Sequence, residues 1–344
     1  MQRALMQDGK GFSADTAAEH AKQIVSQGHR EVSDEEKTRY EHTFRLAELW
    51  LAEATTIGEL VETPRTMTRR EWVGESAPTW ASLAEPVADS IADALMRALT
   101  EQLPDEMLGM VGQSNTMLRN IGGAMFSMQL GQVIGDLAKE VISGGDIGMP
   151  VLTRRRATLI PQNVDAFGEG LDIPASEVEL YLAVREVAHA RLFQHAKWLP
   201  LHLTSQVIEF AHGIQIDVRA IDDLASQIDP SSPEQIREAL SNGSFIPPRT
   251  PQQEAALARI ETMLALVEGW VDVVTQQAVE RLPKGEALGE MMRRRRASGG
   301  PAERAFSSLV GLELRPRRLR EASAMWRLVG EAHGVEAVSY THLR

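Results

Sequence analysis

Helix-start signals followed by long amphipathic runs are the feature that most limits what this chain can fold into. Ser33 and Glu36 form a capping box, a pattern in which the two side chains satisfy backbone N–H groups at the start of a helix. Ser176 and Glu179 make a second such pattern, which predicts a helix over 176–198. Apolar residues recur at helical spacing after both. Similar runs predict further helices over about 80–102, 104–141, 201–228, 233–241, 252–282, 301–312 and 316–333.

Support for β-structure is confined to one segment. Between Gly144 and Gly170 the helical periodicity stops, and Val151–Thr153 and Ala157–Ile160 are short β-like runs. We therefore expect a mainly α-helical protein with at most one small β-hairpin, near residues 150–161.

Two glycines in the helix predicted over 104–141 have a packing role. Gly131 and Gly135 lie one above the other on the helix, so another backbone can approach closely there. We interpret this stretch as a packed core helix.

Composition excludes several classes of protein and site. The chain has no cysteine, which rules out disulfides, thiolate metal sites and a cysteine nucleophile, and fits a reducing compartment. The N-terminus has no apolar region typical of a secretory signal. The charge-free stretch 120–135 is too short and too polar to span a membrane. We expect a cytoplasmic protein with no membrane partner.

The charge distribution argues against a nucleic-acid partner. The net charge is −12, which disfavours general binding to phosphate backbones. Arginines cluster at Arg154–Arg156, Arg293–Arg296 and Arg315–Arg320, but no aromatic residues interleave with the 293–296 run. We interpret these runs as solvated faces and helix ends.

The stretch LAVREVAHARLFQHAKWLP, residues 182–200, carries the main candidate for a site. Its Arg185-Glu186-Val187-Ala188-His189 differs by one residue from the zinc-protease pattern His-Glu-x-x-His. In that pattern two histidines on one helix face bind the metal and the glutamate polarises a metal-bound water. Glu186 is therefore a candidate catalytic base and His189 a candidate metal ligand. Arg185 cannot be a ligand because its guanidinium stays protonated.

Helical spacing places Arg185 in the middle of the apolar arc of this helix, with His189 beside it. Glu186 falls towards the polar edge. An unpaired buried charge is very costly, so Arg185 should pair with a carboxylate from another element. Next to that guanidinium, His189 should stay neutral near pH 7.

His195 is an alternative third ligand, six residues after His189 as in the longer metzincin pattern. That pattern has a glycine where this chain has Leu192. The helix should therefore continue and leave His195 about 120° away from His189.

Glu268 is the better candidate for a third ligand. In LVEGWVDVV, Glu268 and Asp272 lie at i and i+4 on a second predicted helix, and Glu268 borders an apolar stripe. A downstream helical glutamate with an aspartate one turn later is the arrangement of thermolysin-type zinc sites. We expect Arg185 to pair with Glu268 or with another inward carboxylate, with Asp272 in a supporting position. The alternative is an ordinary amphipathic boundary.

The segments REVAHARLFQHAKWLPLHL, LVEGWVDVV, RRRRASGGPAERAF and LVGLELRPRRLREASAMW together resemble the zincin-like metallopeptidase family. The resemblance extends from about residue 45 to Gly334 and implies a zincin-like helical domain. It also implies a hydrolase that acts on a peptide or small-molecule substrate, with zinc as cofactor. A related group, linked to biosynthesis of a deazaflavin cofactor, carries an intact His-Glu-x-x-His. That pattern maps onto Arg185, Glu186 and His189, and its downstream glutamate maps onto Glu268.

The resemblance and the sequence breaks suggest a division of the chain. We expect a loose lead-in over 1–32, an N-terminal helical half over 33–145, and a zincin-like half over 146–336. Residues 337–344 do not continue as the family pattern would, and we interpret them as a truncated or non-native tail.

Three functional hypotheses follow from these motifs. The first is a zincin-like hydrolase that is weak or inactive as a peptidase, because Arg185 replaces a ligand. The second is a pseudoenzyme, a helical scaffold or interaction protein in which Arg185 replaces the metal. The third is a carboxylate di-iron protein, since Glu209 and His212 form a second E-x-x-H and paired motifs of this kind build di-iron sites.

Overall fold

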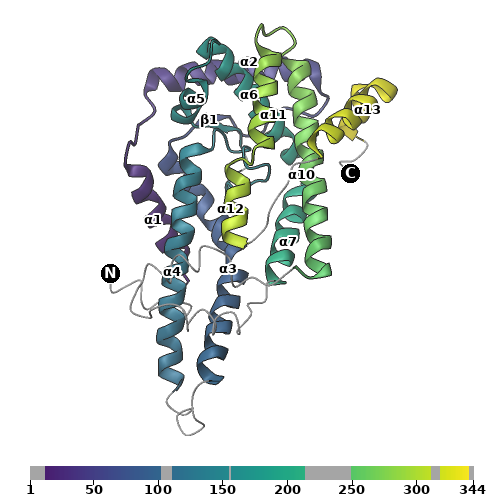
Figure 1. Cartoon of the computed structure of the whole chain (residues 1–344). Coiled ribbons are helices and arrows are strands. Elements are labelled where there is room, and N and C mark those ends of the chain that lie inside the picture. Colours follow the sequence, from purple (N-terminus) through teal and green to yellow (C-terminus); the bar gives the residue numbers. More distant parts are fainter. Residues whose placement is uncertain (1–11, 102–110, 155, 214–248, 311–317, 341–344) are drawn as a thin grey trace.

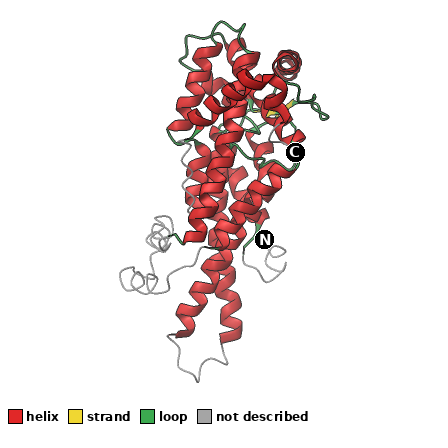
Figure 2. Ribbon diagram, turned by 90° about the vertical axis from the view of Figure 1, so that its right-hand side faces the viewer, coloured by secondary structure: helices red, strands yellow, loops and turns green. Residues whose placement is uncertain are grey.

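The computed structural model describes residues 12–101, 111–154, 156–213, 249–310 and 318–340, and it is mainly helical, as predicted (Figures 1 and 2). None of the described helices has a stretch long and apolar enough to cross a membrane. The helices are α1 (Ala14–Ser26), α2 (Asp34–Ala54), α3 (Arg69–Glu101), α4 (Val111–Glu140), α5 (Pro161–Gly168), α6 (Ala175–His195), α7 (Trp198–His212), α10 (Pro251–Ala278), α11 (Gly285–Ala297), α12 (Pro301–Val310) and α13 (Leu319–Tyr340).

The helix starts agree only in part with the capping signals. Ser33 and Glu36 make the reciprocal bonds of a capping box at α2, as predicted. The capping box predicted from Ser176 and Glu179 is wrong, because α6 begins at Ala175, after Pro174, and has no side-chain cap. Instead, Glu179 is buried and pairs with Arg39 of α2. Because the Glu179 carboxylate pairs with Arg39, it does not cap the N-terminus of α6.

The two long helices α3 and α4 lie side by side and extend beyond the rest of the molecule (Figures 1 and 2). Helix α1 packs against both of them. Its residues Ala17, Ala21 and Val25 are fully buried, so this part of the expected loose lead-in is a packed helix. The close approach inferred for Gly131 is present, because a Cβ there would lie 2.6 Å from the carbonyl oxygen of Ala17.

Among the described residues, the β-structure comprises two short parallel strands, β1 (Arg65–Thr66) and β2 (Thr158–Leu159), and an isolated antiparallel bridge between Ser143 and Leu159. Strand β2 lies in the predicted run Ala157–Ile160. The predicted hairpin is wrong, because β2 pairs with β1 rather than with Val151–Thr153. This strand pair ties the segment after α2 to the segment before α5.

Helix α6 is enclosed by other elements and contacts α2, α5, α10, α11 and β2. Every residue from Val178 to His189 is buried. A helix that is buried on all sides has no polar edge, so the expectation that Glu186 lies at such an edge is wrong. Its polar side chains must find partners inside the protein.

The remaining helical predictions are confirmed in outline, with shifted ends. Helix α3 starts at Arg69 rather than near 80, and α7 starts at Trp198 with Pro200 in its first turn. Helices α5 and α11 were not predicted. The predicted helix 233–241 and the end of the one predicted over 201–228 lie outside the described residues. Helix α13 is kinked at Gly334 (φ 81°), next to the predicted helix end, and a further helical segment then runs to Tyr340, into the segment that we interpret as a tail.

Candidate functional site

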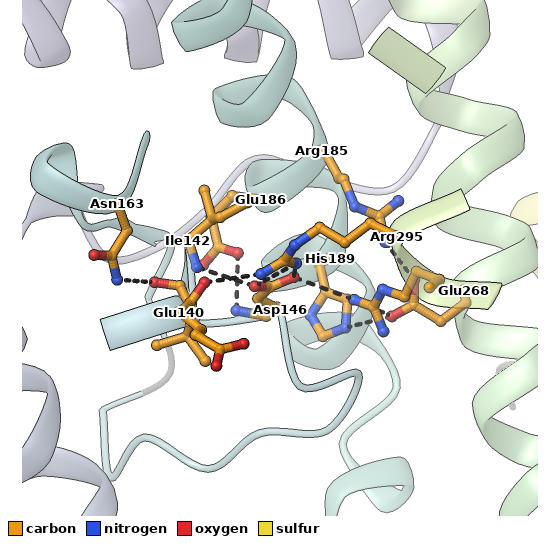
Figure 3. A network of polar contacts seen from close by, with 12 residues as sticks. Glu140, Ile142, Asp146, Asn163, Arg185, Glu186, His189, Glu268 and Arg295 are labelled. Carbon is orange, nitrogen blue, oxygen red and sulfur yellow. Dashed lines mark hydrogen bonds and ion pairs between the residues drawn. The ribbon is translucent and has the colours of Figure 1, made fainter. Parts of the chain in front are cut away.

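Helices α6 and α10 bring Arg185 and Glu268 together, as predicted. A guanidinium nitrogen (Nη2) of Arg185 donates to Oε2 of Glu268, and both residues are buried (Figure 3). Burial alone would raise the pKa of Glu268. The attraction of Arg296 and Arg185 outweighs that cost and lowers the pKa below its usual range, so Glu268 is ionised near neutral pH.

Glu268 has a second cationic neighbour, Arg296 of α11. Nη2 of Arg296 lies 3.0 Å from Oε1 of Glu268 and 3.8 Å from Oδ1 of Asp146, and the side chain is 14% exposed. The contact with Glu268 is an ion pair whose angles do not meet hydrogen-bond geometry. The interpretation of the arginine run as a solvated face is therefore wrong for this residue.

Arg295 also points into the protein, where it bonds to Asp146. Its Nη1 lies 2.8 Å and 2.9 Å from the two carboxylate oxygens of Asp146, and its Nη2 donates to the carbonyl oxygen of Glu140 (Figure 3). The backbone N–H of Ile142 donates to the same carboxylate at 3.0 Å. These contacts keep the pKa of Asp146 below its usual range despite its burial.

Asp272 lies one turn after Glu268 on α10 but bonds elsewhere. It accepts from Nη1 of Arg293 at 3.1 Å and from the hydroxyl of Ser323 at 3.2 Å. Asp272 therefore anchors α11 and α13 to α10, rather than orienting His189 as a supporting carboxylate would.

His189 lies beside the Arg185–Glu268 pair and is buried. Its Nε2 is 4.0 Å from Oε1 of Glu268 and has no hydrogen-bond partner among the described residues. Burial lowers the pKa of His189 to about 4; the charges of Arg185 and Arg296 act in the same direction, whereas Glu268 opposes them. The prediction that His189 stays neutral near pH 7 is confirmed in direction.

Glu186 lies on the other side of His189 from Glu268 (Figure 3). It accepts the backbone N–H groups of Gly145 and Thr158, each at 2.9 Å, so both carboxylate oxygens are engaged. Burial raises the pKa of Glu186 to about 7, although these hydrogen bonds and one to Ser143 favour the charged form.

A glycine pair lets the backbone reach these side chains. A Cβ on Gly145 would lie 2.6 Å from Nδ1 of His189 and 2.9 Å from Oε2 of Glu186, so a larger residue would not fit without a shift. Gly144 is similarly close to Glu186. Beside them is a crevice of about 40 Å³ that reaches Glu186 and His189 and has Arg154 in its lining. That space suits a water-sized group.

Comparisons with known proteins show the family and the fold of the chain. Residues 13–341 match the model of the zincin-like metallopeptidase family. The chain belongs to the zincin-like metallopeptidase family. A crystal structure described as "a putative hydrolase with a novel fold", from Chloroflexus aurantiacus, has a similar fold, with a TM-score of 0.60 at 17% sequence identity. The similarity covers 94% of this chain and 88% of that one. No curated protein matches the sequence.

The zinc that membership of the zincin-like family implies does not fit the residues present. Two donor atoms face each other, Nε2 of His189 and Oε1 of Glu268, and neither has a hydrogen-bond partner in the described part of the chain. Arg185 stands where the pattern has its first histidine, and a second guanidinium, from Arg296, lies against the same carboxylate. Within the described ranges, no group of three or more His, Cys, Asp or Glu side chains could hold a metal.

The other candidate residues lie away from this site. His195 is exposed at the last position of α6, and Glu209 and His212 are exposed on α7. Glu209 pairs with Arg259 across the surface at 3.2 Å. The second E-x-x-H thus faces solvent while Glu186 is buried, so the di-iron hypothesis is wrong.

Asp146, Arg295 and Arg296 belong to the site but were not recognised from the sequence. One signal was available: Arg293 and Arg296 lie three residues apart, which places them on one face of a helix. Since α11 was not predicted, that spacing could not be interpreted.

Proposed function

We propose that this chain is a member of the zincin-like family that works without zinc, as a cytoplasmic helical scaffold or interaction protein. The observation that carries the proposal is the buried pair between Arg185 and Glu268, formed where the family pattern has a ligand and its partner ligand. A guanidinium neutralises the carboxylate that would otherwise bind the metal.

The state of Glu186 supports the same proposal. Each oxygen of Glu186 accepts one backbone N–H group, which occupies part of the acceptor capacity that a general base would use to take a proton from water. In this arrangement Glu186 holds the loop after α4 and strand β2 against α6, which is a structural role.

A second candidate is a hydrolase with weak activity on a peptide or small molecule. Burial raises the pKa of Glu186 to about 7, which suits proton transfer near neutral pH. The crevice beside Glu186 and His189 gives a water-sized group access to both. The residual reaction would then use Glu186 as the base.

Elemental analysis and a peptidase assay test the proposal. Untagged protein purified without chelators should contain zinc well below one equivalent, and it should not cleave casein or a peptide library. EDTA should not change its melting temperature. Glu186→Gln (E186Q) serves as the control for contaminating activity, because contaminants are insensitive to it.

Two results would separate the candidates. Stoichiometric zinc, or cleavage that EDTA abolishes and E186Q removes, would overturn the metal-free proposal. Cleavage that resists EDTA but is lost in E186Q would favour the second candidate.

A further inference from the structure

We propose that two arginines, Arg185 and Arg296, jointly replace the metal ion at this site. The inference rests on the proposed metal-free function and extends it to a residue outside the His-Glu-x-x-His pattern. Each carboxylate oxygen of Glu268 faces one guanidinium: Oε2 faces Arg185, and Oε1 faces Arg296 at 3.0 Å. Together the two arginines place two positive charges on Glu268, the charge of one divalent cation.

Arg296 lies next to the two donor atoms that remain. Nε2 of His189 is 4.0 Å from Oε1 of Glu268, the same oxygen that Arg296 contacts. Any cation held between His189 and Glu268 would therefore lie close to the Arg296 guanidinium. Repulsion between a divalent ion and a fixed positive charge is strong in a site with little water.

The fold holds Arg296 in this position. Helix α11 follows α10 after a short connection, and its arginines pair with α10 in reverse order: Arg293 with Asp272, and Arg296 with Glu268. Asp146 contacts Arg296 at 3.8 Å and binds the neighbouring Arg295 at 2.8 Å. These anchors on both sides hold the part of α11 that carries Arg296 against α10 and the loop after α4.

Restoring the missing ligand is therefore not sufficient for zinc to bind. Arg185→His (R185H) returns the i, i+4 histidine pair but leaves Arg296 on Glu268. The double variant R185H/R296M also removes that guanidinium and keeps most of its aliphatic stem. We expect R185H/R296M to bind zinc about 100-fold more tightly than R185H, or more.

The experiment is a zinc titration of native protein, R185H, R185H/R296M and R185H/R294M, with cobalt absorption as a second readout of coordination. R185H/R294M is the matched control, since Arg294 is on the same helix but 77% exposed and paired with Glu290. It should behave like R185H. Adding His189→Ala to R185H/R296M should abolish binding.

The outcomes separate this inference from the proposed function. Equal zinc affinity in R185H and R185H/R296M would overturn the role of Arg296, while a metal-free native protein would still support the proposed function. Native protein that binds zinc would overturn the proposed function itself. If R185H/R296M is unfolded without metal, R185H/R296Q is the second variant. Failure of both double variants to bind zinc more tightly than R185H, or to fold on its addition, would also contradict the inference.

Discussion

At the scale of single residues, Glu268 is the charge on which the site depends. Arg185 and Arg296 both face it, and none of the three side chains is more than 14% exposed. A buried carboxylate is stable only while its partners remain, and buried guanidinium groups depend equally on the carboxylate. Replacing Glu268, Arg185 or Arg296 by an uncharged residue should therefore lower the free energy of unfolding by different amounts.

Glu268→Gln should destabilise the protein more than Arg185→Met. The first change leaves Arg185 without its anion and Arg296 with only the more distant Asp146, and it should cost on the order of 3–5 kcal/mol. The second change leaves Glu268 paired with Arg296. Arg185→Met should therefore destabilise the protein less than the loss of one partner from an isolated buried ion pair. Urea unfolding of both variants would measure the difference. Equal destabilisation would mean that Arg296 does not compensate.

Glu186 and His189 should cancel each other in the pH dependence of stability. Folding raises the pKa of Glu186 from 4.5 to about 7 and lowers the pKa of His189 from 6.5 to about 4. Between about pH 4.5 and 6.5 the unfolded chain carries one proton on His189, whereas the folded protein carries one on Glu186. The two residues together bind the same number of protons in the folded and unfolded states, so they do not change the free energy of unfolding with pH in this range.

Single substitutions should reveal the two opposite slopes. In E186Q only His189 remains, so stability relative to native protein should fall as the pH drops from 6.5 towards 4. In His189→Gln (H189Q) only Glu186 remains, so stability should fall as the pH rises from 4.5 to 7. Each slope should approach about 1.4 kcal/mol per pH unit. Urea unfolding across this range would test both, and slopes of the same sign would refute the cancellation.

At the scale of elements, the packing of α1 on α4 depends on glycine. Gly131 allows the backbone of Ala17 to approach, and Gly135 allows the side chain of Ile24 to do so. Because a Cβ at Gly131 would meet a backbone carbonyl, the contact cannot be relieved by a side-chain rotation.

Gly131→Ala should destabilise the protein by about 1–3 kcal/mol through overpacking. Gly74→Ala in α3 is the matched control, because that glycine is also helical and a Cβ there meets nothing within 4 Å. The control should be neutral or stabilise by about 0.5–1 kcal/mol, since alanine has the higher helix propensity. Thermal or urea unfolding distinguishes the two. If both variants behaved alike, α1 would not be packed as described.

At the scale of the whole molecule, α11 joins segments that are far apart in the sequence. Arg293 and Arg296 bind carboxylates of α10, and Arg295 binds Asp146 in the loop after α4. The loop in turn donates its Gly145 N–H to Glu186 of α6. One short helix therefore fixes the relative positions of the elements that form the site.

Arg295→Met should cost about 2–3 kcal/mol, because it leaves the buried carboxylate of Asp146 with the Ile142 N–H and the more distant Arg296. Arg294→Met should change stability by less than about 0.5 kcal/mol, since its pair with Glu290 is exposed. Chemical denaturation of the two variants gives a direct comparison. A cost at Arg294 as large as that at Arg295 would exclude the specific role of α11.

Local sequence patterns were sufficient to predict the helices with strong periodicity and the need of Arg185 for a buried carboxylate partner. Helical spacing and capping are local, so α2, α6 and α10 could be recognised from short windows. An arginine on an apolar arc requires an anion, which follows from the cost of a buried charge alone. The choice of Glu268 as the main candidate for that anion needed, in addition, the resemblance to zinc-site patterns with a downstream helical glutamate.

The elements that cover α6, and the groups that donate hydrogen bonds to it, could be known only from the three-dimensional arrangement of distant segments. The pairing of β1 with β2 and the packing of α1 on α4 join distant segments, and no local pattern encodes them. Glu186 seemed to lie at a polar edge because its real partners, the N–H groups of Gly145 and Thr158, come from a loop and a strand. The arginine run 293–296 suggests a solvated face, but α11 packs against α10 and buries most of the Arg296 side chain. In each case the free energy of a polar group depends on what surrounds it in space.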